Sequence, residues 1–193
     1  MATLIRLISG SDVKLLNGST GTSIQRGKNR TELEANIEKQ VKDKKMVVPS
    51  LEEAIEYLNE INPEDIQVGL LFIDQAPYVE ASQNMGSSLS YFRQRVQEDG
   101  IYWKSRVLQF CARKDITALT ANVVFEANGD GMGNFEEVAC RMDVALDAIA
   151  SQVEGRLIVQ HNTGNPIVDM SLLMWGMKQR KAGRKVSFLV NSF

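Results

Sequence analysis

An unbroken apolar stretch, Val68 to Ile73, constrains the fold of this chain more than any other feature. The stretch is far shorter than the ~20 apolar residues that cross a bilayer, so it does not predict a membrane span. It also lacks the polar–apolar alternation of a strand with one wet face. A strand of this kind is covered on both faces, which is typical of parallel sheets in α/β proteins.

Strand and helix patterns alternate along most of the chain. Capping-box pairs, Thr31 with Glu34 and Ser50 with Glu53, mark two helix starts. The stretch 115–128 is ambiguous between helix and strand. The patterns predict strands over 3–8, 46–48, 67–73, 106–112, 157–160 and 185–190, and helices over 31–41, 50–61, 85–99, 135–153 and 166–182.

This alternation predicts an α/β fold with helices on both faces of the sheet. Because crossovers are right-handed, the sheet should be mostly parallel. The 193 residues fit one Rossmann-like domain over 1–193, with 17–30 as a loop or weak hairpin insertion because it is rich in Gly, Ser, Thr and Asn.

Composition excludes several classes of protein. A net charge of −2 and a pI near 5.6 argue against general nucleic-acid binding. Cys111 and Cys140 are the only cysteines, so one disulfide is possible but a disulfide framework is not. Because the N-terminus also does not resemble a secretory signal, we expect two reduced thiols in a cytoplasmic protein that does not enter membranes. The single histidine excludes most His-rich metal sites, and no cofactor or metal is predicted.

Ligands of such sheets bind at the carboxyl ends of the strands, near the point where strand order reverses. Three loops of unusual composition follow predicted strands: 9–12, 74–77 and 161–166. In the last, Asn165 is the expected N-cap and Pro166 the first helical residue. Free backbone N–H groups there, with Thr163 and Gly164, favour an anion or phosphate site. The alternative is a turn that only caps the helix.

The segment 156–190 resembles the C-terminal unit of CRISPR-associated Rossmann-fold (CARF) domains. In that family a strand enters an Asn-x-[Thr/Ser]-Gly-type loop, and a Met recurs in the following helix. The matching positions here are Asn162, Thr163, Gly164, Pro166 and Met170. Asn165 and Ile167 stand where the family usually has a second Gly or Thr and often a Lys.

The resemblance implies a homodimer whose two-fold symmetric pocket binds a cyclic oligoadenylate second messenger. Some stand-alone members also cleave the ring, by attack of a ribose 2′-OH on the adjacent phosphate without a metal. No catalytic residue is predicted for this chain. The residues expected to bind the ligand are Ser9, Gly10, Ser11, Asn162, Thr163, Gly164, Asn165 and Lys178, with Arg180 as another source of positive charge.

Asp74 suggests a competing hypothesis, because an acid after a buried strand resembles the phospho-acceptor of receiver domains. Receiver chemistry needs an acidic pair after the first strand to hold Mg²⁺, and only Asp12 is available there. The predicted end of the next strand, 110–113, lacks the required hydroxyl. This alternative is therefore a degenerate receiver-like module that regulates a partner protein, or Asp74 only caps a turn.

The remaining candidates are weaker. His161 could serve as the general base of a small-molecule hydrolase, but a lone histidine at a strand end is more often structural. The glycine-rich segment 128–133 lacks the phosphate-loop pattern and its lysine. The basic residues 178–185 fit a helix C-terminus. A methionine-rich helix around Trp175 is expected to be core or dimer interface, through Met170, Met174 and Met177.

Overall fold

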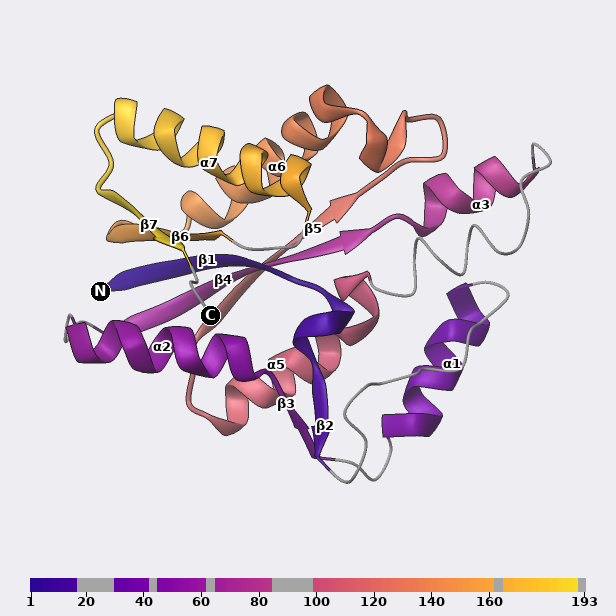
Figure 1. Cartoon of the computed structure of the whole chain (residues 1–193), viewed down its shortest axis with the longest axis horizontal. Coiled ribbons are helices and arrows are strands. Elements are labelled where there is room, and N and C mark those ends of the chain that lie inside the picture. Colours follow the sequence, from indigo (N-terminus) through magenta and orange to yellow (C-terminus); the bar gives the residue numbers. More distant parts are fainter. Residues whose placement is uncertain (17–29, 42–44, 62–64, 85–98, 162–164, 191–193) are drawn as a thin grey trace.

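The computed structural model describes residues 1–16, 30–41, 45–61, 65–84, 99–161 and 165–190. Its centre is a five-stranded, fully parallel sheet with the order β5-β4-β1-β6-β7 (Figure 1). This confirms the predicted Rossmann-like α/β fold. The strands are β1 (Ala2–Ile8), β4 (Ile66–Asp74), β5 (Ala118–Val124), β6 (Arg156–His161) and β7 (Val186–Val190).

Strand order fixes where a ligand crevice can form. Numbered along the chain, the parallel strands lie in the order 3-2-1-4-5, as in doubly wound dinucleotide-binding sheets. The order reverses between β1 and β6, which pair from Ala2 with Arg156 to Ile5 with Val159. The carboxyl ends of β1 and β6 therefore form the topological switch point.

Helices cover both faces of this sheet (Figure 1). One face carries α2 (Pro49–Ile61) and α5 (Lys104–Arg113), and the other carries α6 (Phe135–Ala150) and α7 (Pro166–Lys181). Successive residues of the central strands face opposite layers. Leu70 and Phe72 pack with α2 and α5, whereas Leu71 packs with α6 and α7. This explains why the apolar stretch does not alternate.

The remaining elements lie around this framework. They are α1 (Arg30–Val41), α3 (Ala76–Asn84), the antiparallel pair β2 (Lys14–Leu16) and β3 (Lys45–Val47), and the short 3₁₀ helices η1 (Gly10–Asp12), η2 (Gly100–Trp103) and η3 (Gly131–Gly133). Among the described residues, no helix is long and apolar enough to span a bilayer.

One predicted strand is wrong. Residues 106–112 belong to helix α5, whose buried side chains Val107, Phe110 and Cys111 recur at helical spacing. The third parallel strand is β5, which lies in the stretch that the sequence leaves ambiguous. A short apolar segment cannot be assigned to helix or strand by its spacing alone, so residues 106–112 resemble a strand in sequence.

A second correction concerns Ser50. The capping-box pattern predicts Ser50 as an N-cap, but α2 already includes Pro49. The Ser50 hydroxyl bonds instead to Arg6 and Asp12, as described below. The predicted helix over 85–99 and the insertion 17–30 lie outside the described residues, apart from Asp99 and Arg30 at their ends.

Candidate functional site

Described residues from both predicted ligand loops lie at the switch point. Ser9 follows β1 and leads into η1, while Asn165 is the N-cap of α7, which begins at Pro166. The structure thus brings Ser9, Gly10, Ser11 and Asn165 to one edge of the sheet. Asn162, Thr163 and Gly164 lie outside the described residues. The role of all these residues in ligand binding remains a prediction.

A buried arginine that the sequence did not single out lies beneath this edge. Arg6 of β1 is 6% exposed, and its Nη2 is 2.6 Å from Oδ1 of Asp12 and 3.0 Å from Oγ of Ser50. Its Nη1 donates to Oε1 of Gln160 on β6 at 3.2 Å, and its Nε donates to the carbonyl of Leu7. Arg6 therefore connects both strands of the switch point to η1 and α2.

Asp12 is the centre of the same network. Its Oδ1 also accepts from the Ser50 hydroxyl at 3.1 Å, and its Oδ2 accepts from the Ser9 amide at 2.8 Å and the Ser9 hydroxyl at 3.0 Å. The hydroxyls of Ser9 and Ser11 lie 2.6 Å apart. Burial lowers the pKa of Arg6, partly offset by Asp12. The network fixes the conformation of the loop that presents Ser9 and Ser11.

The start of α7 forms as predicted. The Asn165 side chain accepts from the Ile167 amide at 3.0 Å, and Pro166 occupies the first turn. Next to it, His161 is half-buried, and its Nε2 has no hydrogen-bond partner. Burial lowers the pKa of His161, and the charge of Asp169 opposes this shift. No described hydroxyl bonds to this imidazole, so the geometry does not favour the hydrolase hypothesis.

Lys178 does not join this site within one chain. It lies in the last turn of α7, about 18 Å along the helix axis from Pro166 at 1.5 Å per residue. Its ammonium pairs with Asp143 of α6 at 2.8 Å. The sequence placed Lys178 in the right helix, but a helix that starts at the carboxyl edge carries its last turn to the opposite edge.

A second polar group lies at the end of β4. Asp74 is buried, accepts from the Ala76 amide at 3.1 Å, and pairs with Arg30 of α1 at 2.9 Å. Asp99 accepts from the backbone and side chain of Gln75 at 2.7 Å each. These bonds give Asp74 a structural role as a turn cap.

The hydroxyl of Tyr102 on η2 is buried near this group and has no hydrogen-bond partner. Its pKa is raised by burial and further by the charges of Asp99 and Asp74. A Cβ on neighbouring Gly100 would stand only 1.9 Å from the carbonyl oxygen of Ile8, so η2 packs tightly against the end of β1. The cluster of polar residues at the end of β4 is therefore next to the switch point.

Sheet order also bears on the receiver-like alternative. Receiver domains have the order 2-1-3-4-5, whereas this sheet has 3-2-1-4-5. Residues 110–113, the predicted strand end in that hypothesis, lie in α5 and at its end. The observed topology does not support a receiver-like domain.

The glycine-rich loop before α6 already holds an anion of its own. The Glu137 carboxylate accepts from the amides of Asp130 and Gly131, and it pairs with Arg141 at 2.7 Å. Burial opposes ionisation, but these hydrogen bonds outweigh it and lower the pKa of Glu137. Because Glu137 occupies the free N–H groups, this loop is not a phosphate site.

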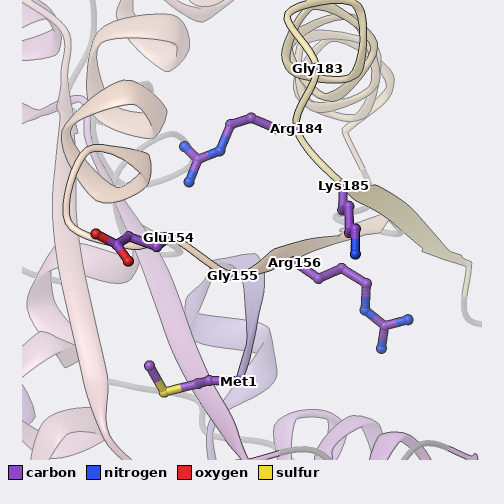
Figure 2. A pocket seen from close by; sticks show the side chains of 7 residues that line it. All are labelled: Met1, Glu154, Gly155, Arg156, Gly183, Arg184 and Lys185. Atoms are coloured by element: carbon purple, nitrogen blue, oxygen red, sulfur yellow. The ribbon is translucent and has the colours of Figure 1, made fainter.

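A separate hollow of about 640 Å³ lies at the amino-terminal edge of the sheet (Figure 2). Its lining includes Arg156, Arg184, Lys185 and Glu154. Figure 2 shows the guanidinium of Arg184 turned toward the end of α6, where it donates to the carbonyls of Ala150 and Val153. This hollow lies at the edge opposite to the switch point, where ligands of open α/β sheets do not usually bind.

Comparison with protein-family models, with curated proteins and with solved structures gives no match. Within the described part of the chain, no three His, Cys, Asp or Glu side chains gather in a way that could hold a metal ion. Function therefore has to be inferred from the switch point itself.

Proposed function

We propose that this chain is a CARF-like sensor that binds a cyclic oligoadenylate second messenger at the switch point, as a homodimer in which both copies contribute to the pocket. One observation carries the proposal. The loop 9–11 and the capped start of α7, which the sequence predicts as ligand-binding segments, lie at the edge where strand order reverses.

The chemistry of this edge suits a phosphate-linked ligand. Pro166 has no N–H and the Ile167 amide bonds to Asn165, so the positive end of the α7 dipole is what favours an anion here. The hydroxyl of exposed Ser11 can donate to a phosphate oxygen, and Asp12 orients the neighbouring Ser9. The Arg6 network supports the proposal because it holds this loop in one conformation, which lowers the entropic cost of binding.

The two thiols fit the cytoplasmic setting in which such a messenger would be met. Cys111 is buried and Cys140 exposed, and neither forms a disulfide. Burial raises the pKa of Cys111 to about 11, which makes its thiol unreactive.

A thermal-shift screen tests the proposal with cyclic oligoadenylates of several ring sizes, linear oligoadenylates and common nucleotides. A ring at 100 times its Kd should stabilise the fold by about 2.7 kcal/mol, a shift of a few degrees. Ser11→Asp should abolish the shift, since it places a carboxylate against the phosphates, and Ser11→Ala should reduce it.

Lys185→Ala is the matched control, because Lys185 lines the hollow at the opposite edge. Chromatography of the recovered ligand separates binding from ring cleavage. If no ring raises the melting temperature at high concentration, the proposal is wrong.

A further inference from the structure

Helix α7 exposes an apolar stripe on its outer surface. The stripe consists of Met170, Leu173, Met174 and Met177, which are 52%, 39%, 51% and 58% exposed. The opposite face of the helix is buried in the core. Figure 1 shows α7 on the outside of its layer, and among the described elements none lies over it. We call these four residues the methionine stripe.

The stripe is large for a surface that is left in water. Its four side chains expose roughly 400 Å², which is the size of the largest apolar patch on many monomers, and such patches are often interaction sites. Their spacing is i, i+3, i+4, i+7, so they form one continuous ridge. Methionine side chains are flexible and pack well at interfaces.

The spacing of the stripe is symmetric about the peptide bond between Leu173 and Met174. When two copies of the helix pack antiparallel across a two-fold axis, Met170 of one faces Met177 of the other, and Leu173 faces Met174. Such an isologous contact brings the same patch from both copies together. The stripe is therefore complementary to the same stripe on a second copy of the chain.

Charge along α7 favours the same arrangement. Its first turn carries an acid, Asp169, and its last turn carries Lys178, Arg180 and Lys181. Antiparallel packing places the acidic start of each helix beside the basic end of the other, and it also opposes the two helix dipoles. Parallel packing would place the two basic ends together.

We propose that the methionine stripe is the dimer interface of this chain, with two α7 helices packed antiparallel. By the symmetry of the stripe, Lys181 of each copy then lies opposite Pro166 of the other, next to the cap Asn165. Each dimer then has two composite sites, one at each end of the helix pair, in place of the single two-fold symmetric pocket that the CARF resemblance implies. This second part rests on the proposed function, because it adds a cation to that ligand site.

Lys181 of the second copy adds a positive charge that Arg6 and Lys178 of the same chain do not supply to the ligand site. The guanidinium of Arg6 directs its hydrogen bonds to protein groups, and Lys178 of the same chain is at the far end of α7. Lys181 is exposed and lies one turn beyond Met177 on the stripe face. A phosphate at the start of α7 would therefore meet its lysine from the second copy.

The area indicates a dimer of modest affinity. Two stripes together bury roughly 800 Å², and the charged residues at their ends bring the contact toward the ~1,200 Å² at the lower limit of stable interfaces. Sedimentation velocity of the full chain over a wide concentration range should show a monomer–dimer equilibrium.

Met174→Glu should weaken this dimer at least tenfold, because it brings two carboxylates together at the centre of the contact. Val144→Glu is the matched control, since Val144 is 68% exposed on α6 and lies outside the stripe. At concentrations where the wild type is monomeric, both variants should keep its melting temperature, because neither position is in the core. A chain that stays monomeric at all concentrations, or a dimer that Met174→Glu leaves intact, would overturn the proposal.

Cross-linking tests the direction of packing. In a Cys140→Ser background, mild oxidation of mixed Met170→Cys and Met177→Cys chains should give a mixed disulfide dimer, and each variant alone should give little. Rapid self-cross-linking of Met170→Cys alone would show parallel packing and overturn the antiparallel arrangement.

Ligand and dimer can fail separately. If rings shift the melting temperature of wild type but not of Lys181→Glu, the composite site is supported. If rings bind equally well to Lys181→Glu, the shared site is wrong although the proposed function stands. If no ring binds while the cross-links form as expected, the interface stands and the proposed ligand is wrong.

Discussion

Charged side chains are buried at one edge of the sheet and exposed at the other. At the carboxyl edge, Arg6 is almost fully buried and bonded to Asp12, Ser50 and Gln160. At the amino edge, Lys185 is exposed beside an open hollow. A buried charge is costly unless it is paired and hydrogen-bonded, whereas a surface charge costs little. The buried network, rather than the size of a hollow, therefore marks the edge with a specified geometry.

The largest effect is expected when the buried Arg6–Asp12 ion pair is broken. Asp12→Ala should lower the free energy of unfolding by about 3 kcal/mol or more, because it leaves the Arg6 guanidinium buried without its carboxylate. Urea unfolding measures the change. Arg6→Met combined with Asp12→Ala should cost less than the two single changes together, since the pair is then removed as a unit.

Lys185→Ala at the opposite edge is the control and should leave the urea midpoint unchanged. If Asp12→Ala and Lys185→Ala lower the free energy of unfolding equally, the charges at the two edges do not differ in their importance for stability.

The tight packing of η2 against β1 gives the next effect. Gly100→Ala should destabilise the fold by about 2–3 kcal/mol, because its Cβ would meet the Ile8 backbone, which cannot move easily. Gly133→Ala is the matched control, since no atom lies within 4 Å of its added Cβ. A Gly100→Ala protein as stable as Gly133→Ala would show that the switch-point loops are loosely packed.

A smaller effect is expected at the glycine-rich loop between β5 and α6. Glu137→Gln should cost roughly 1–2 kcal/mol at pH 7, because it weakens charge-assisted hydrogen bonds to two amides and Arg141. The folded-state pKa of Glu137 is lowered, so its stabilisation is present above the ordinary carboxyl pKa and is lost as pH falls through the lowered value. The free energies of unfolding of the wild type and Glu137→Gln should therefore converge in acid. A constant difference between them down to low pH would contradict this account.

The smallest effect concerns His161, the only imidazole in the chain. Its folded-state pKa lies below the ordinary 6.5, so the unfolded chain binds a proton more readily and stability declines as pH falls from 7 toward 5. His161→Gln should flatten this part of the pH profile. The single imidazole resonance in an NMR titration measures the pKa directly, and a midpoint above 6.5 would refute the assignment.

Sequence patterns predicted the framework of the site but not its supports. The apolar stretch of β4 predicted a doubly covered strand, and Asn165 with Pro166 predicted the start of α7, because these signals are local. Arg6 and Gln160 are 154 positions apart, and no local pattern links them. The same reason explains Ser50, whose hydroxyl bonds Asp12 across 38 positions although its sequence context is that of a cap.

The sequence by itself determined the fold class, because alternating strand and helix patterns with short connections leave few arrangements. It also determined which loops follow the strands. Only the tertiary structure decided that β1 and β6 are neighbours and that Arg6 is buried under their ends. Strand order and burial depend on contacts between distant segments, so they are fixed only when the helices pack on the sheet.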